Sequence, residues 1–264
     1  MTPCDMEAAA RELAAARLNG KAVHPLSQGL SPRDAGQGYA IQHRLHGLLT
    51  EAGEGPATGQ KIGCTTQVMR EKLGIDQPCA GRIHARRVLG DAGQWSVAGR
   101  IKPSVECEIA VRLGRDLPTI AAHYTTDSVR SAVAACMASI ELCDDRYTDR
   151  EAVGVPTLIA DDFYNVGCAL GREIADWRSI DLSAVAGSMR INGGETGRGK
   201  GGDIMGHPLA ALAWLADLRA SEGQHLKAGE FVTLGSIVSS QRVAPGDRVE
   251  IEIESLGRIA ISVI

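Results

Sequence analysis

The stretch VECEIAVRL, residues 105–113, alternates apolar side chains with polar or small ones. This period of two predicts a β-strand, with Val105 and Cys107 on its apolar face and Glu106 and Glu108 on the other. Residues two apart on a strand have Cα atoms roughly 6.5–7 Å apart, and their side chains emerge on the same side. Glu106 and Glu108 can therefore converge on one cation, with the short oxygen distances that Mg²⁺ requires.

A third carboxylate, Glu141, belongs to a segment whose apolar residues recur at helical spacing, so residues 125–143 are predicted to form a helix. The apolar stripe consists of Val129, Val133, Cys136, Met137 and Ile140. Glu141 follows at the edge of this stripe, and a helix packed on the sheet would bring it to the other two carboxylates. Three carboxylates with water suit Mg²⁺ or Mn²⁺ better than zinc, which prefers nitrogen and sulfur ligands.

The spacing of the glutamates does not by itself establish a metal site, because an E-x-E pattern on a strand is usually its solvated face. The same alternation occurs at Glu250, Glu252 and Glu254, where we expect only a surface strand. Like charges on one face repel each other unless a cation or solvent separates them, which favours a metal slightly.

The composition of the chain argues against several classes of protein. The 264 residues are 44% hydrophobic, and the formal net charge of -4 argues against nucleic acid as a partner. No apolar run approaches the roughly 20 residues that span a bilayer, and the N-terminal stretch lacks a signal-peptide pattern, so we expect no membrane association. The 7 cysteines include no C-x-x-C pair, which predicts reduced thiols, a cytoplasmic location and no cysteine-ligated zinc.

Two regions of the chain differ in their sequence pattern. Residues 1–55 are predicted to form a helical N-terminal lobe, with an amphipathic helix over residues 5–20 and a second helix capped by Ser31 ahead of Pro32. Residues 56–264 alternate short apolar runs with Gly, Pro and Asp turns, which predicts a β-rich catalytic body.

The glycine-rich segment 193–202 is a near miss to the phosphate-binding pattern G-x-x-x-x-G-K-[ST], because Gly201 follows Lys200 where Ser or Thr is required. It begins at Asn192-Gly193, a typical hairpin turn. We expect a flexible hairpin near the mouth of the site. No G-x-S-x-G elbow is present, so a serine hydrolase is not expected.

A series of short motifs runs in order from about residue 30 to the end of the chain. They are GQKIG at 59–63, LGIDQP at 73–78, IKPSVECEIA at 101–110, LGRDL at 113–117, IELCDDR at 140–146, IAD at 159–161, MGHPL at 205–209, AWLA at 213–216, PGDR at 245–248 and LG at 256–257. Together they resemble the 2-keto-4-pentenoate hydratase and 2-oxo-3-hexenedioate decarboxylase family of the fumarylacetoacetate hydrolase superfamily. The resemblance implies an α+β fold, a mixed β-sandwich roll with a helical N-terminal lobe.

The same resemblance implies roles for single residues. The family's metal glutamates fall on Glu106, Glu108 and Glu141, its active-site lysine falls on Lys61, and an active-site aspartate falls on Asp76. Family members form homo-oligomers, so we expect the same of this chain.

The chain departs from the family pattern after IAD at 159–161, where hydratases usually continue Asn-Ala-Ser and this chain continues with DFY at 162–164. The segment LGSI at 234–237 is also altered. We expect these departures to change how the distal end of the substrate is recognised. The candidate substrate-binding residues are Asp161, Asp162 and Ser236.

The expected chemistry is that of a 2-oxo acid chelated to Mg²⁺, which would stabilise an enolate. Lys61 would hold the substrate carboxylate or the enolate charge, and Asp76 would carry a proton or orient a water molecule. The leading hypothesis is a lyase that hydrates a 2-hydroxypenta-2,4-dienoate (2-keto-4-pentenoate) to a 4-hydroxy-2-oxo acid in the catabolism of aromatic compounds.

Three alternatives stay open. The first is decarboxylation of 2-oxo-3-hexenedioate (4-oxalocrotonate), a dianion that Asp162 would disfavour if it faced the pocket. The others are an acylpyruvate-type C–C hydrolase and a non-catalytic relative that keeps the metal site. An aldolase or a decarboxylase of the same pathway is the partner enzyme that these hypotheses suggest.

Overall fold

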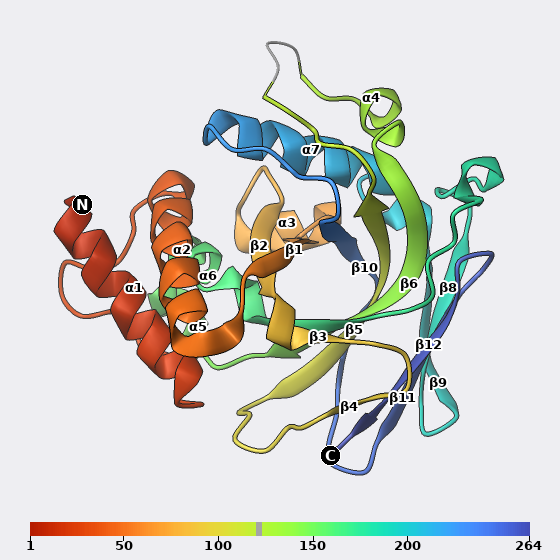
Figure 1. Cartoon of the computed structure of the whole chain (residues 1–264). Coiled ribbons are helices and arrows are strands. Elements are labelled where there is room, and N and C mark those ends of the chain that lie inside the picture. The colour runs from red at the N-terminus through yellow and green to blue at the C-terminus, as the bar shows by residue number, and fades with distance from the viewer. Residues whose placement is uncertain (120–122) are drawn as a thin grey trace.

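The computed structural model describes residues 1–119 and 123–264, without the side chains of residues 150 and 151. Two β-sheets make up the body, and α1 and α2 lie beside them (Figure 1). The α-helices are α1 (Pro3–Leu18), α2 (Ala35–Leu49), α3 (Gln67–Leu73), α4 (Thr126–Arg130), α5 (Arg150–Val153), α6 (Val155–Ala160) and α7 (Pro208–Ser221). The shorter helical turns are η1 (Thr50–Glu54), η2 (Ala85–Arg87), η3 (Asp162–Tyr164), η4 (Trp177–Ser179) and η5 (Gly201–Asp203).

The larger sheet has seven strands in the order β2-β1-β10-β5-β6-β7-β3. Its strands are β1 (Ala57–Gly63), β2 (Cys79–His84), β3 (Val88–Leu89), β5 (Pro103–Leu113), β6 (Val133–Asp144), β7 (Asn165–Leu170) and β10 (Phe231–Arg242). The β1–β10 and β3–β7 pairs are parallel and the other pairs are antiparallel, so the sheet is mixed, as predicted.

The smaller sheet has five strands in the order β4-β12-β11-β8-β9. They are β4 (Gly93–Trp95), β8 (Ala186–Ile191), β9 (Gly194–Lys200), β11 (Arg248–Ile253) and β12 (Gly257–Val263). The β8–β9 connection is a tight hairpin turn in which Asn192 and Gly193 both have positive φ, which confirms the predicted turn.

The main hydrophobic core includes buried side chains from both sheets and from α7, such as Ile109, Ile251 and Leu212. The alternation predicted for residues 105–113 places Cys107 and Ile109 in this core. The α+β class and the mixed two-sheet body therefore follow the prediction. No helix among the described residues is long and apolar enough to cross a membrane.

A second hydrophobic cluster joins the N-terminal helices to the body. Leu13 of α1 and Leu45 of α2 pack with Leu158 of α6, Tyr147 and Phe163. The division into residues 1–55 and 56–264 stays a prediction, because the cluster combines residues from both ranges.

The helix predicted for residues 125–143 is wrong. Only α4 is helical, and β6 follows it from Val133 to Asp144 in the middle of the larger sheet. Every residue of β6 except Ala134 is buried, because β5 and β7 flank the strand and both faces are covered. A strand buried on both faces loses its alternation, and apolar residues at any spacing then fit it.

The second N-terminal helix begins later than predicted. Its N-cap is Asp34, whose side chain accepts from the backbone N–H of Gln37, and not Ser31. The side chain of Gln37 accepts from the backbone N–H of Arg33, so two hydrogen bonds hold the start of the helix. α7 begins at Pro208, and His207 is its N-cap.

Candidate metal centre and active site

Three carboxylates converge on the larger sheet. Glu106 of β5 lies directly opposite Glu141 of β6 in the antiparallel ladder, and Glu108 is two residues along β5. One oxygen from each side chain lies within 4.8 Å of the other two. Glu106 is partly exposed, whereas Glu108 and Glu141 are buried, so the cluster is open on one side. The third carboxylate therefore comes from a neighbouring strand, and no packed helix is needed.

The cluster carries more negative charge than its surroundings balance. Burial and the charge of Glu141 raise the pKa of Glu106 to about 7. The same two causes raise the pKa of Glu108 well above its ordinary value. One oxygen of Glu108, Oε1, is buried and has no hydrogen-bond partner among the described residues. A divalent cation that prefers oxygen ligands would satisfy this atom and separate the charges, so the residues fit such an ion.

A buried cation faces these carboxylates. Lys61 of β1 is 3% exposed, and its Nζ lies 3.3 Å from Oε1 of Glu141. Burial lowers the pKa of Lys61, but Glu141 and other anionic neighbours outweigh this effect, and the pKa lies above its ordinary value. Gly63 leaves room for the ammonium, because a Cβ at that position would lie 2.9 Å from Nζ. Lys61 is therefore held as a cation that can bind an anion.

Asn165, at the start of β7, completes the contacts of Glu141. Its Nδ2 donates to Glu141 Oε1 at 2.9 Å and to the carbonyl of Gly167 at 3.2 Å. Glu141 Oε1 thus meets both Lys61 and Asn165. No sequence signal marks Asn165 as part of the site, because it merely follows the segment 162–164, in which the chain departs from the family pattern.

The predicted substrate-binding residue Ser236 bonds to the main chain. Its hydroxyl lies 2.6 Å from the carbonyl of Val238 and 3.2 Å from that of Cys107. The preceding residue is the one that reaches the carboxylates, since the backbone N–H of Gly235 donates to Glu108 Oε2 at 3.1 Å. Its φ is +118°, and a Cβ there would meet Thr65 at 2.4 Å, so glycine is required.

Asp161 and Asp162 are fully buried and face other charged groups. Asp161 accepts from Arg17 Nε at 3.1 Å and from the hydroxyl of Tyr147 at 2.8 Å, and it also pairs with Arg146. Their role in substrate binding stays a prediction, and the contacts show that neither side chain is without partners.

Asp76 lies apart from the contacts described so far. It is exposed on the segment between α3 and β2, and its side chain makes no hydrogen bond or ion pair with any described residue. The structure thus brings together Lys61 and the three glutamates and leaves Asp76 at the surface.

The family model for the fumarylacetoacetate hydrolase C-terminal domain matches residues 81–264, which include all three glutamates. The chain is 36% identical to 2-keto-4-pentenoate hydratase 1 of Dechloromonas aromatica (strain RCB), over 96% of this chain and 95% of that protein. It is 27% identical to 4-oxalocrotonate decarboxylase of Pseudomonas putida, over 96% and 94% of the two chains.

Solved structures agree with this likeness. The 4-oxalocrotonate decarboxylase from Pseudomonas putida G7, complexed with magnesium and adipate, superposes with a TM-score of 0.92 at 25% identity, covering 100% of this chain and 99% of that one. Fumarylpyruvate hydrolase from Pseudomonas aeruginosa, in complex with Mn²⁺ and pyruvate, shares the fold at a TM-score of 0.63 and 16% identity, over 78% and 88% of the chains. The chain therefore belongs to the family of 2-keto-4-pentenoate hydratases and 2-oxo-3-hexenedioate decarboxylases, within the fumarylacetoacetate hydrolase superfamily.

Proposed function

We propose that this protein is a hydro-lyase, dependent on Mg²⁺ or Mn²⁺, that adds water to a 2-hydroxypenta-2,4-dienoate-like substrate and yields a 4-hydroxy-2-oxo acid. The observation that carries the proposal is the convergence of Glu106, Glu108 and Glu141 within 4.8 Å beside the buried cation Lys61. Relatives that are 32–36% identical over nearly the whole chain, and are named 2-keto-4-pentenoate hydratases, support this substrate class.

The three glutamates are the proposed metal ligands. A bound Mg²⁺ or Mn²⁺ would supply the Lewis acidity that stabilises the enolate of a 2-oxo acid. The solved decarboxylase that resembles this chain was complexed with magnesium in one case and with calcium in another, which supports a divalent ion with oxygen ligands.

Lys61 would hold the negative charge of the substrate. Because its pKa lies above the ordinary value, the amine keeps its proton and is a poor general base. It can instead donate to a substrate carboxylate or to the oxygen on which enolate charge develops.

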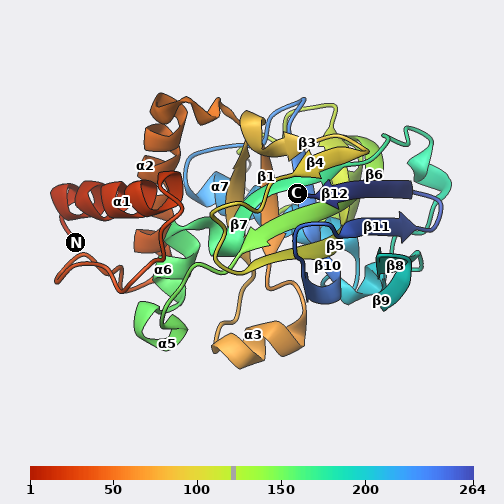
Figure 2. The ribbon, with the colours of Figure 1, turned by 90° about the horizontal axis from the view of Figure 1, so that it is seen from below.

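Asp76 remains the proposed proton carrier, although its side chain is exposed and makes no hydrogen bond or ion pair with a described residue. No residue of α3 is buried, Val68 is 75% exposed, and Figure 2 shows the helix projecting from the body, although Leu73 at its end packs against the second hydrophobic cluster. An Asp76→Asn variant that kept full turnover would exclude this role.

Decarboxylation of 2-oxo-3-hexenedioate is the second candidate, supported by the likeness to 4-oxalocrotonate decarboxylase, and one contact removes an argument against it. The carboxylate of Asp162 pairs with Arg17 at 3.1 Å and lies 2.9 Å from Nε2 of His46. Its charge therefore does not argue against a substrate with two carboxylates, as it would if it faced the pocket unpaired.

The test is a panel of 2-hydroxydienoates and 2-oxo diacids, followed by ultraviolet absorbance before and after removal of divalent ions with a chelator. We expect metal-dependent loss of the dienoate signal with formation of a 4-hydroxy-2-oxo acid. Release of carbon dioxide from the diacid alone would assign the decarboxylase. Tight metal binding without any turnover would assign the non-catalytic alternative.

A homo-oligomeric state, a cytoplasmic location and a partner enzyme of the same pathway belong to this proposal as predictions. Light scattering on the purified protein checks the first. Co-purification with an aldolase or a decarboxylase checks the last.

A further inference from the structure

Three successive non-glycine residues have positive φ angles: +56° at Asp162, +50° at Phe163 and +72° at Tyr164. Elsewhere in the described chain such residues occur only singly. The left-handed region costs a residue with a Cβ roughly 1–2 kcal/mol, so this turn persists only if surrounding contacts impose it. We call residues 162–164 the left-handed turn.

The left-handed turn delivers two groups to the candidate active site. The carbonyl of Phe163 accepts from Lys61 Nζ at 3.3 Å. The residue that follows the turn, Asn165, donates from Nδ2 to Glu141 Oε1 at 2.9 Å. Lys61 and Glu141 also pair with each other at 3.3 Å, so the turn and the residue that follows it together contact both partners of this ion pair.

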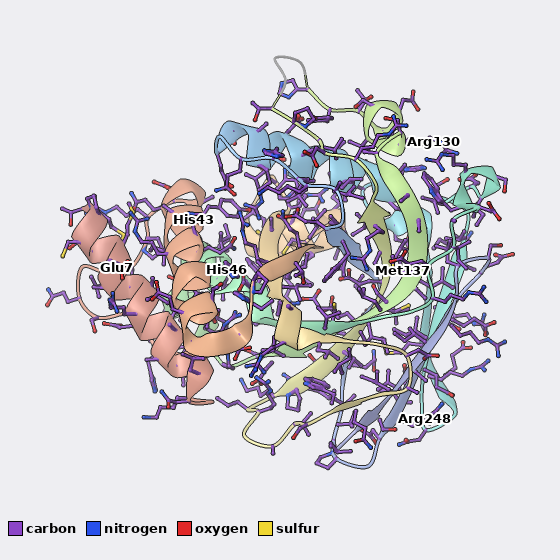
Figure 3. All side chains as sticks on the ribbon, viewed as in Figure 1. Glu7, His43, His46, Arg130, Met137 and Arg248 are labelled. Atoms are coloured by element: carbon purple, nitrogen blue, oxygen red, sulfur yellow. The ribbon has the colours of Figure 1, made fainter. Side chains whose placement is uncertain are left out.

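Asp162 anchors the turn to three other elements. Its Oδ1 lies 2.9 Å from Nε2 of His46 on α2 and accepts from the backbone N–H of Arg82 on β2 at 3.0 Å. Its Oδ2 lies 3.1 Å from Nη1 of Arg17 on α1. Figure 3 labels His46 on α2, between that helix and the strands. Burial raises the pKa of Asp162, but His46 and Arg17 outweigh burial and hold it below its ordinary value, so the carboxylate stays charged.

His84 and the carbonyl of Gly55 in turn hold His46 in place. Nδ1 of His46 lies 2.8 Å from Nε2 of His84, and Nδ1 of His84 lies 2.7 Å from the carbonyl of Gly55. The two rings are stacked with centroids 5.0 Å apart. His46 is therefore held at both ring nitrogens, and it cannot turn away from Asp162 without losing a buried contact.

The backbone of β2 separates Asp162 from Lys61 by a single glycine. A Cβ at Gly81 would lie 3.0 Å from Asp162 Oδ1 and 3.2 Å from Lys61 Cγ. Asp162 and Lys61 therefore lie on either side of Gly81, and a side chain at this position would press on both of them.

We propose that Asp162 is a positioning residue for the reaction: held by Arg17 and His46, it fixes the left-handed turn that orients Lys61 and Glu141. The N-terminal helices act through it on the active site, although they contribute no residue to the carboxylate cluster. The kinetic part of this inference rests on the proposed function, and its structural part does not.

Asp162→Asn is the direct test, because the amide keeps the size of the side chain and removes the charge that Arg17 and His46 hold. We expect the kcat of the full-length enzyme to fall about tenfold or more, since small misplacements of catalytic groups are costly. The KM should change by less than about threefold, because no substrate contact is removed.

Glu222→Gln is the matched control. Glu222 pairs with the buried Arg219 at 2.8 Å, at the end of α7 and outside the carboxylate cluster, so the same change of charge is made at a buried arginine. We expect it to lower the melting temperature without changing kcat. If Asp162→Asn behaved like this control, with stability lost and kcat kept, the positioning role would be excluded.

His46→Gln keeps the inference testable if Asp162→Asn does not fold. Its amide can still donate to Asp162 but cannot also engage His84, so we expect a smaller loss of kcat than for Asp162→Asn, with KM again nearly constant. Wild-type kcat in a folded His46→Gln variant, when Asp162→Asn cannot be obtained, would overturn the inference.

The two proposals fail differently. Absence of turnover by the wild-type enzyme on the whole panel contradicts the proposed function alone. A crystal structure of Asp162→Asn, or of His46→Gln in its place, then decides the inference: we expect the Lys61–Phe163 and Asn165–Glu141 hydrogen bonds to lengthen beyond hydrogen-bonding distance. If both stayed intact, Asp162 would not position the site.

Discussion

At the scale of single residues, the neighbours of Lys61 determine its charge and therefore its chemistry. Its position on β1 leaves the side chain buried, with Glu141 and the carbonyl of Phe163 both 3.3 Å from Nζ. A buried ammonium without anionic partners would lose its proton, whereas here the neighbouring carboxylates keep the pKa above the ordinary value. The chemistry available to Lys61 is therefore the binding of negative charge.

Lys61→Ala should lower kcat by at least about tenfold, which corresponds to roughly 1.4 kcal/mol of barrier, because the stabilisation of enolate or carboxylate charge is lost. Steady-state kinetics on the dienoate substrate measure it. Lys102→Ala is the control, since Lys102 also pairs with a carboxylate, Asp145 at 3.5 Å, but is much more exposed. A change confined to thermal stability would make Lys61 a structural residue.

Some single residues could be placed from the sequence and others could not. Glu106 and Glu108 share a face because strand period alone requires it. Arg17, His46 and Asn165 gave no signal, since their contacts join positions that are 144, 116 and 24 residues apart in the chain. Nothing in the local sequence of α1 indicates that Arg17 points at a buried aspartate.

At the scale of elements, β6 marks the limit of periodicity. The strand, from Val133 to Asp144, includes Cys136, Met137 and Ile140, whose spacing matches the apolar face of a helix. The structure buries them on both faces of a central strand, so their spacing carries no information about secondary structure. Glu141 nevertheless reaches Glu106, because the β5–β6 register places the two directly opposite each other.

The parallel β1–β10 pair depends on close packing at one glycine. Phe231 lies against Gly59, where a Cβ would come within 2.1 Å of the aromatic ring. Gly59→Ala should therefore destabilise the protein by about 1–3 kcal/mol or more through overpacking. Chemical denaturation measures the free energy of unfolding.

Gly47→Ala is the matched control for this prediction. Gly47 lies within α2, and a Cβ there would meet nothing within 4 Å. The substitution should stabilise the protein by roughly 0.5–1 kcal/mol, because glycine is unfavourable in a helix interior. Equal effects of the two substitutions would contradict the packing of Phe231 on Gly59.

At the scale of the whole molecule, the carboxylate cluster links metal binding to folding. Any ion that binds only the folded state stabilises it, by about 2.7 kcal/mol when its free concentration is 100 times its dissociation constant. We expect Mg²⁺ to raise the melting temperature of the wild-type protein. The double variant Glu106→Ala with Glu108→Ala should stay folded, show no Mg²⁺-dependent turnover and lose this thermal response; full activity of the double variant would exclude these residues as ligands.

The pH dependence of stability should change sign when metal is added. Without metal, the pKa of Glu106 is raised to about 7, mainly by burial and by Glu141, from an ordinary value of 4.5. Between these two values the folded state binds more protons than the unfolded state, so this group's contribution to stability is fully present below pH 4.5 and is lost as pH rises through 7. Metal requires the deprotonated carboxylates, so at a fixed Mg²⁺ concentration its stabilisation should instead grow with pH across the same window.

Melting temperatures from pH 5 to 8, with Mg²⁺ or with a chelator, measure both trends, and Glu106→Gln is the reference that lacks the titrating group. If the wild type and Glu106→Gln showed the same pH dependence without metal, Glu106 would not be the carboxyl that takes up the proton, and the charge repulsion inferred for the cluster would be wrong.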